Sequence, residues 1–138
     1  METLSLISIY CGGALTFLMG IFHTRFFKLF KWKKELGKIT EANKNIFYTI
    51  HIALLLLFFE IAALSLFYAK EVSLGIGISF GINLLCAVFW LWRAIWQILY
   101  FKPDKNSKLL PLHYILIVYF SLLCIAYALP DIIKLMLS

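Results

Sequence analysis

Three histidines are the side chains of this sequence best suited to hold a metal or carry a proton. His23, His51 and His113 each lie near one end of a long apolar run. Imidazole is a common ligand of Zn, Cu and Fe, and it titrates near neutral pH. If the runs are antiparallel helices, the three imidazoles fall at a similar depth, and helical periodicity turns each of them inward. This placement predicts a transition-metal or haem-type site, linked to redox chemistry.

The spacing of the histidines matches no local ligand motif, so a second interpretation stays open. An isolated histidine near a membrane boundary can simply donate a hydrogen bond or lie among head groups. Arg93 and Gln97 stand four residues apart on one helical face and would complete a polar pocket. Such a pocket would suit an anionic head group or a quinone-like ring. Alternatively, Arg93 extends to the membrane surface, and the nearby tryptophans, Trp90 among them, form an interfacial belt.

Glu60 is the carboxylate that lies deepest in an apolar run. An ionisable group inside a membrane is costly and is by default a functional hypothesis. Nine residues separate it from His51, which is a rotation of about 180° on an ideal helix. The alternative function is therefore an oligomeric channel or a proton-coupled transporter that uses Glu60. The structural alternative is a protonated Glu60 that donates a hydrogen bond to a neighbouring helix.

The elements that must position these side chains are membrane helices. Of the 138 residues, 63% are hydrophobic and 14% are charged, which is far more apolar than a typical soluble domain. This composition excludes a soluble enzyme, a secreted disulfide scaffold and a disordered chain. Four runs are long enough to cross a bilayer as helices. We expect one all-α domain over residues 1–138, an antiparallel four-helix bundle with spans near 4–24, 46–69, 72–101 and 109–129.

The basic residues predict how the bundle is oriented. Ten Lys and Arg lie between the first and second runs or between the third and fourth, whereas the other side carries only Lys70 and Lys134. The positive-inside rule places both basic loops in the cytoplasm and both termini outside, as in a bacterial inner membrane. A nucleic-acid partner is not expected, because the basic residues stand between membrane spans. The short Lys70–Glu71 connection predicts a tight hairpin between the second and third helices.

The first basic loop has a pattern of its own. Aromatic and basic residues alternate at helical spacing over 25–38, which predicts an amphipathic helix lying in the membrane interface with Gly37 as its C-cap. Thr40, followed by Glu41, predicts the N-cap of the second span. The basic side chains that would meet anionic lipid head groups are Arg25, Lys28, Lys31, Lys33 and Lys34.

Small residues predict where helices approach one another closely. Gly12 and Gly20 stand on the first span, and Gly77 and Gly81 form a GxxxG pattern on the third. These faces could pack within the bundle or between the subunits of a homo-oligomer. They support a third hypothesis, a non-catalytic assembly or lipid-binding protein that works through the small-residue faces and the basic loop.

Overall fold

The computed structural model describes residues 1–101, 103 and 109–137, and this part of the chain contains helices and no strand. Four helices are long and apolar enough to cross a membrane: α1 (Glu2–Thr24), α4 (Glu41–Phe67), α6 (Ile78–Leu99) and α7 (Leu110–Leu137). The predicted all-α class and the four long apolar helices are confirmed. By length and composition, the chain is an integral membrane protein.

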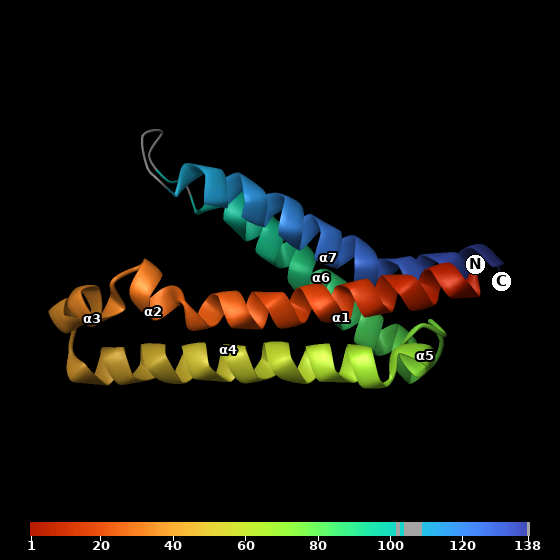
Figure 1. Ribbon diagram of the computed structural model, residues 1–138, viewed down its shortest axis with the longest axis horizontal. Helices are drawn as coiled ribbons and strands as arrows, with labels where there is room; N and C mark the ends of the chain where they lie inside the picture. The colour runs from red at the N-terminus through yellow and green to blue at the C-terminus, as the bar shows by residue number, and fades with distance from the viewer. Residues whose placement is uncertain (102, 104–108, 138) are drawn as a thin grey trace.

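The four long helices form two pairs that cross at an angle (Figure 1). Helix α1 packs against both α4 and α7, and α7 packs against α6. Both termini and the short helix α5 lie at one end of the bundle, while α2 and α3 lie at the other (Figure 1). We call the half that holds the termini the terminal half and the half that holds α2 and α3 the loop half. Toward the loop half, the α6–α7 pair diverges from α1 and α4 (Figure 1).

The connection between α4 and α6 is longer than a tight hairpin, so that prediction is wrong. Lys70 and Glu71 belong to α5 (Ala69–Val72), and residues 73–77 separate it from α6. Gly75 and Gly77 adopt φ angles of 62° and 56°, which glycine tolerates without strain. A Cβ on Gly75 would lie 2.8 Å from the carbonyl oxygen of Pro130, so only glycine lets this turn approach α7. Helices α4 and α6 are not among the pairs that pack extensively.

The fourth span continues beyond its predicted end at residue 129. Helix α7 passes through Pro130 and ends at Leu137. Proline cannot donate the backbone hydrogen bond of a helix interior and commonly bends a helix. Accordingly, α7 changes direction toward its C-terminal end (Figure 1).

The basic loop folds as short helical pieces rather than as one amphipathic helix. They are α2 (Phe26–Leu29), α3 (Trp32–Glu35) and the 3₁₀ turn η1 (Leu36–Lys38). The break falls at Lys31, whose φ of 51° is left-handed and cannot continue a helix. It turns Trp32 back onto α4, where its ring lies 4.6 Å from that of Phe47, centroid to centroid. Aromatic packing on α4 thus takes the place of the expected continuous helix.

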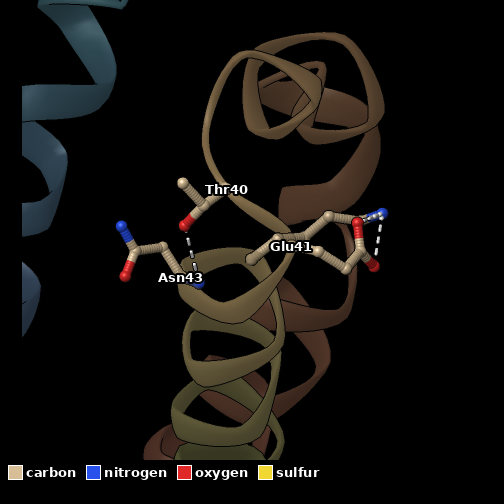
Figure 2. A network of polar contacts seen from close by, with 4 residues as sticks. Thr40, Glu41 and Asn43 are labelled. Atoms are coloured by element: carbon tan, nitrogen blue, oxygen red, sulfur yellow. Dashed lines mark hydrogen bonds and ion pairs between the residues drawn. The ribbon is translucent and has the colours of Figure 1, made fainter.

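The start of α4 is capped as predicted (Figure 2). The side-chain oxygen of Thr40 accepts a hydrogen bond from the backbone N–H of Asn43 at 3.4 Å. Glu41 forms an ion pair with Lys44 at 3.2 Å, one turn further on. These contacts satisfy a free donor and place an acidic residue at the positive end of the helix dipole.

The two predicted small-residue faces differ in whether they make close contacts. A Cβ on Gly12 would lie 3.2 Å from the ring of Tyr127, and one on Gly20 would lie 3.0 Å from the ring of Phe59. These glycines therefore serve contacts within the bundle. Gly77 and Gly81 have no atom within 4 Å of such a Cβ, so the GxxxG pattern serves no close contact within the described part of the chain.

Candidate functional site in the loop half

Two of the three histidines come together. The rings of His23 on α1 and His51 on α4 lie 5.9 Å apart, centroid to centroid, and are nearly parallel, at 24°. Nδ1 of His23 donates a hydrogen bond to the Met19 carbonyl at 3.0 Å. His51 packs edge-on against Trp32 at 4.6 Å and Phe27 at 5.3 Å, and both histidines are buried. Nε2 of His51 is buried and has no hydrogen-bond partner among residues 1–101, 103 and 109–137.

His113 lies apart from this pair, so the predicted site shared by three histidines is wrong. Its Nδ1 accepts a hydrogen bond from Nε2 of Gln97 at 3.2 Å. Within residues 1–101, 103 and 109–137, no group of three or more His, Cys, Asp or Glu could hold a metal ion. Helical periodicity correctly turned each histidine inward, and all three are buried. The divergence of the helix pairs, which no local pattern reveals, is the reason that similar depth does not bring them together (Figure 1).

Arg93 points into the bundle. Its guanidinium carbon lies 4.6 Å from the centroid of the Phe120 ring on α7. The side chain is half-buried, and its Nη1 is buried without a hydrogen-bond partner. The ion pairs in the described part of the chain are Glu35–Lys38 and Glu41–Lys44, so no carboxylate there compensates Arg93. The interpretation in which Arg93 extends to the membrane surface therefore does not fit this geometry.

A stack of aromatic rings joins the two helix pairs beside Arg93. Trp90 lies between Phe58 on α4, at 5.4 Å and 16°, and Phe120 on α7, at 5.7 Å and 18°. The Phe58 ring in turn contacts His23 at 4.9 Å. Trp90 is fully buried, so it belongs to the core rather than to the predicted interfacial belt. Its indole Nε1 has no acceptor among the described residues. This aromatic stack is the physical link between the histidine pair and Arg93.

The loop half thus contains several buried polar atoms that the described residues leave unpaired. We call them the unpaired polar set: Nε2 of His51, Nε1 of Trp90, Nη1 of Arg93 and Oε1 of Gln97. Trp90, Arg93 and Gln97 follow one another at helical spacing along one face of α6. Their periodicity is visible in the sequence, but the absence of partners depends on how α4 and α7 are placed.

Near these residues, an apolar groove runs between α1 and α7. Its volume is about 200 Å³, and its lining includes Met19 and Phe22 from α1 and Leu112, Leu116 and Tyr119 from α7. Met19 and Leu116 belong to the same apolar core as Trp90 and Phe120. On α1 the groove ends one residue before His23. It could receive the hydrocarbon part of a molecule whose polar part reaches the unpaired polar set.

Glu60 and Asp131 are carboxylates within long apolar helices, and the structure places them in opposite environments. Glu60 is exposed on the outer surface of α4 and has no hydrogen bond or ion pair with the described residues, so it does not line an interior path of this bundle. Asp131, which the sequence reasoning missed, is only 6% exposed. Its Oδ1 accepts a hydrogen bond from Nδ2 of Asn83 at 2.9 Å. Asp131 lies beyond residue 129, where the predicted fourth span ends, so the sequence pattern did not place it inside a helix.

Comparisons with protein-family models, with curated proteins and with solved structures give no match, so the function must be argued from the site itself. The class that the fold defines is an all-helical integral membrane protein with four candidate spans.

Proposed function

We propose that this protein binds an amphipathic anion inside the membrane, in the loop half of the bundle. The guanidinium of Arg93 pairs with the anionic group, and the groove between α1 and α7 holds part of the hydrocarbon chain. One observation carries the proposal, namely a guanidinium that faces inward over Phe120 with a buried, unpartnered Nη1. An uncompensated charge within a membrane span costs several kcal/mol, by rough order of magnitude. A carboxylate or phosphate would relieve that cost through charge-assisted hydrogen bonds.

The other unpaired atoms suit the same kind of ligand. The indole of Trp90 can only donate, and Nε2 of His51 donates in one of its two tautomers. Along α6, Trp90 and Arg93 offer donors to one oxygen-rich group, and Oε1 of Gln97 can accept from a hydroxyl or a protonated acid. His51, on the other helix pair, would contact a different part of the same molecule. A neutral quinone would use the same donors but would leave the Arg93 charge uncompensated. The charge therefore favours an anion over a quinone.

A haem-type cofactor is a second candidate, and the free ring nitrogen of His51 favours it. Nε2 of His51 has no partner, whereas Nδ1 of His23 is engaged by Met19. A haem iron takes a histidine nitrogen as axial ligand, and its propionates would pair with Arg93. This candidate predicts a Soret band in the purified protein. Replacement His51→Ala should abolish the band, and His113→Ala should leave it. A protein that binds no added haem excludes this candidate.

We further propose that the basic loops face the cytoplasm of a bacterial inner membrane and that both termini lie outside. Ten Lys and Arg against two support this orientation. The unpaired polar set then lies in the cytoplasmic half of the bilayer, where an amphipathic anion in the inner leaflet could reach it. Cysteine labelling from either side of the membrane, at residues 33 and 70, distinguishes the two orientations.

The experiment for the main proposal compares two ligands with the same hydrocarbon chain. The protein is placed in phosphatidylcholine nanodiscs, and its thermal unfolding is followed with added oleate or oleyl alcohol. Oleate should raise the melting temperature and oleyl alcohol should not, because only oleate carries a charge. A ligand at a hundred times its Kd stabilises a protein by about 2.7 kcal/mol.

Variants test whether the rise in melting temperature with oleate depends on Arg93. Arg93→Gln should abolish the oleate shift, and Arg93→Lys should retain part of it because the charge remains. Arg25→Gln, which removes an exposed arginine from the loop, is the matched control and should respond like the unmodified protein. An equal shift with oleyl alcohol, or an undiminished oleate shift in Arg93→Gln, would contradict the proposal.

A further inference from the structure

A second hollow lies at the opposite end of the molecule and uses none of the residues discussed so far as binding groups. Its volume is about 430 Å³. Three separate parts of the chain line it: the first turns of α1, the segment that runs from α5 into the turn before α6, and the last turns of α7. Both termini lie at this end of the bundle (Figure 1). The hollow therefore opens where the apolar spans end.

The charged lining is of both signs. Lys70 on α5 and Lys134 on α7 both line the hollow, and both side chains are exposed. In the described part of the chain, neither ammonium has an ion-pair partner. Two ammonium groups at one hollow attract an anionic group such as a phosphate diester. Glu2 is the acidic residue of the lining and supplies a site for a cation beside it.

The hydroxyl groups of Ser5 and Ser73 in the lining favour a ligand that donates hydrogen bonds over a second anion. The hydroxyl of Ser73 donates to the carbonyl of Lys70 at 2.9 Å, and that of Ser5 donates to the carbonyl of Met1 at 3.5 Å. Because each hydroxyl has one proton, the oxygens that remain can only accept. A phosphate has no proton to offer them at neutral pH, whereas a primary ammonium has three. The lining thus combines two cations for a phosphate with Glu2 and two hydroxyl oxygens for an ammonium.

Apart from Thr3, the remaining lining is hydrocarbon, from Leu6, Leu74, Ile76, Pro130, Ile133 and Leu137. We propose that this hollow binds a phospholipid whose head group carries a primary ammonium, as in phosphatidylethanolamine. Lys70 and Lys134 hold the phosphate, Glu2 and the serine oxygens hold the ammonium, and the apolar side chains contact the first part of the acyl chains. The proposal is independent of the ligand at the loop half.

The test measures which lipid stays on the protein. The purified protein is equilibrated with equal amounts of phosphatidylethanolamine, phosphatidylcholine and phosphatidylglycerol that have identical acyl chains. Excess lipid is then removed, and the retained lipid is quantified by mass spectrometry. Phosphatidylethanolamine should be enriched, because choline has no N–H and glycerol has no positive charge. Free phosphoethanolamine should not displace it, since that molecule lacks the acyl chains.

Two variants test whether the retained phosphatidylethanolamine is bound in the hollow. The double variant Lys70→Gln/Lys134→Gln should lower retention about tenfold, as expected for two exposed ion pairs. Glu2→Gln should lower the preference for ethanolamine over choline while leaving phospholipid bound. Lys38→Gln/Lys44→Gln, which removes two ammonium groups at the other end of the bundle, is the matched control. Equal retention of the three lipids, preference for phosphatidylglycerol, or no loss in the Lys70/Lys134 variant would overturn the proposal.

Discussion

The two halves of the bundle treat their buried polar groups in opposite ways. In the terminal half, the hydroxyl of Tyr127 shares hydrogen bonds with Thr16 at 3.1 Å and with Ser65 at 2.9 Å. There, too, Nδ2 of Asn83 donates to Asp131 at 2.9 Å and to the Val72 carbonyl at 3.0 Å. The loop half contains the four atoms of the unpaired polar set. Oδ1 of Asn83 is the one unpartnered side-chain atom of this kind in the described terminal half.

This difference separates what holds the fold from what awaits a ligand. A buried polar group that is paired across helices fixes their relative position, since moving the helices would leave it unpaired. A buried polar group without a partner destabilises the chain by about 1–3 kcal/mol. Four such groups, three along α6 and one on α4, are a cost that a bound molecule can remove. We therefore interpret the terminal half as a structural lock and the loop half as a binding region.

The largest predicted effect compares two buried amides on α6. Asn83→Leu removes both hydrogen bonds of Nδ2 and leaves the buried carboxyl of Asp131 without this donor. The free energy of unfolding should fall by about 3 kcal/mol. Gln97→Leu removes one hydrogen bond, to His113, together with one unpaired oxygen, and should cost clearly less. Reversible unfolding in mixed micelles measures both. Equal losses would remove the distinction between the halves.

The next effect tests the lock at Tyr127. Tyr127→Phe keeps the ring but removes the hydroxyl that links α1, α4 and α7, and the loss should be about 2 kcal/mol. Tyr114→Phe is the matched control, because the Tyr114 side chain is 60% exposed. It should change the free energy of unfolding by less than about 0.5 kcal/mol. A Tyr127→Phe protein as stable as the control would show that the hydrogen bonds do not lock the helices.

Close packing provides a third comparison. A Cβ on Gly13 would come within 2.9 Å of the Cβ of Ser65, so Gly13→Ala should destabilise the protein by about 1–2 kcal/mol. Gly81→Ala meets no atom within 4 Å and should be neutral or stabilise α6 through the higher helix propensity of alanine. Thermal unfolding of the two variants measures the difference. A destabilised Gly81→Ala would instead indicate that the GxxxG face contacts a second copy.

The smallest predicted effect has the opposite sign. In the ligand-free protein, Arg93→Gln removes a charge that no described residue compensates, but it also removes the cation–π contact with Phe120, which offsets most of that gain. The net stabilisation should be about 1 kcal/mol or less. The same unfolding assay, carried out after exhaustive delipidation, measures this change. A substantial loss of stability would mean that the contact with Phe120 makes Arg93 part of the lock.

The sequence predicted the helices well because their signals are local. The presence of four long apolar helices and the Thr40 cap depend on neighbouring residues, and the structure confirms both. The predicted bounds were less accurate, because the third helix is Ile78–Leu99 instead of 72–101 and the fourth continues to Leu137. For the candidate site, the sequence predicted the orientation of single side chains but not which of them lie together. Periodicity turned His23, His51 and His113 inward, but it could not show that the two helix pairs diverge. The pairing of Asn83 with Asp131 joins residues 48 apart along the chain and left no local signal.

Two other differences have equally non-local causes. The left-handed conformation of Lys31 is unfavourable by itself, and it follows from the packing of Trp32 against His51 on α4. Trp90 resembles its neighbours in the tryptophan cluster, yet it alone is enclosed between Phe58 and Phe120. In both cases the partner lies on another helix, so composition and spacing predicted a membrane-surface role instead.

The most direct test of the account is the dissociation constant for oleate in phosphatidylcholine nanodiscs, measured for three proteins side by side. Arg93→Gln should weaken binding about tenfold or more, as expected for the loss of a partly buried charge pair. Tyr127→Phe, a change in the terminal half, should leave the affinity within about twofold once the protein is folded. Equal affinity in the unmodified protein and Arg93→Gln would contradict the assignment of the loop half as an anion-binding region.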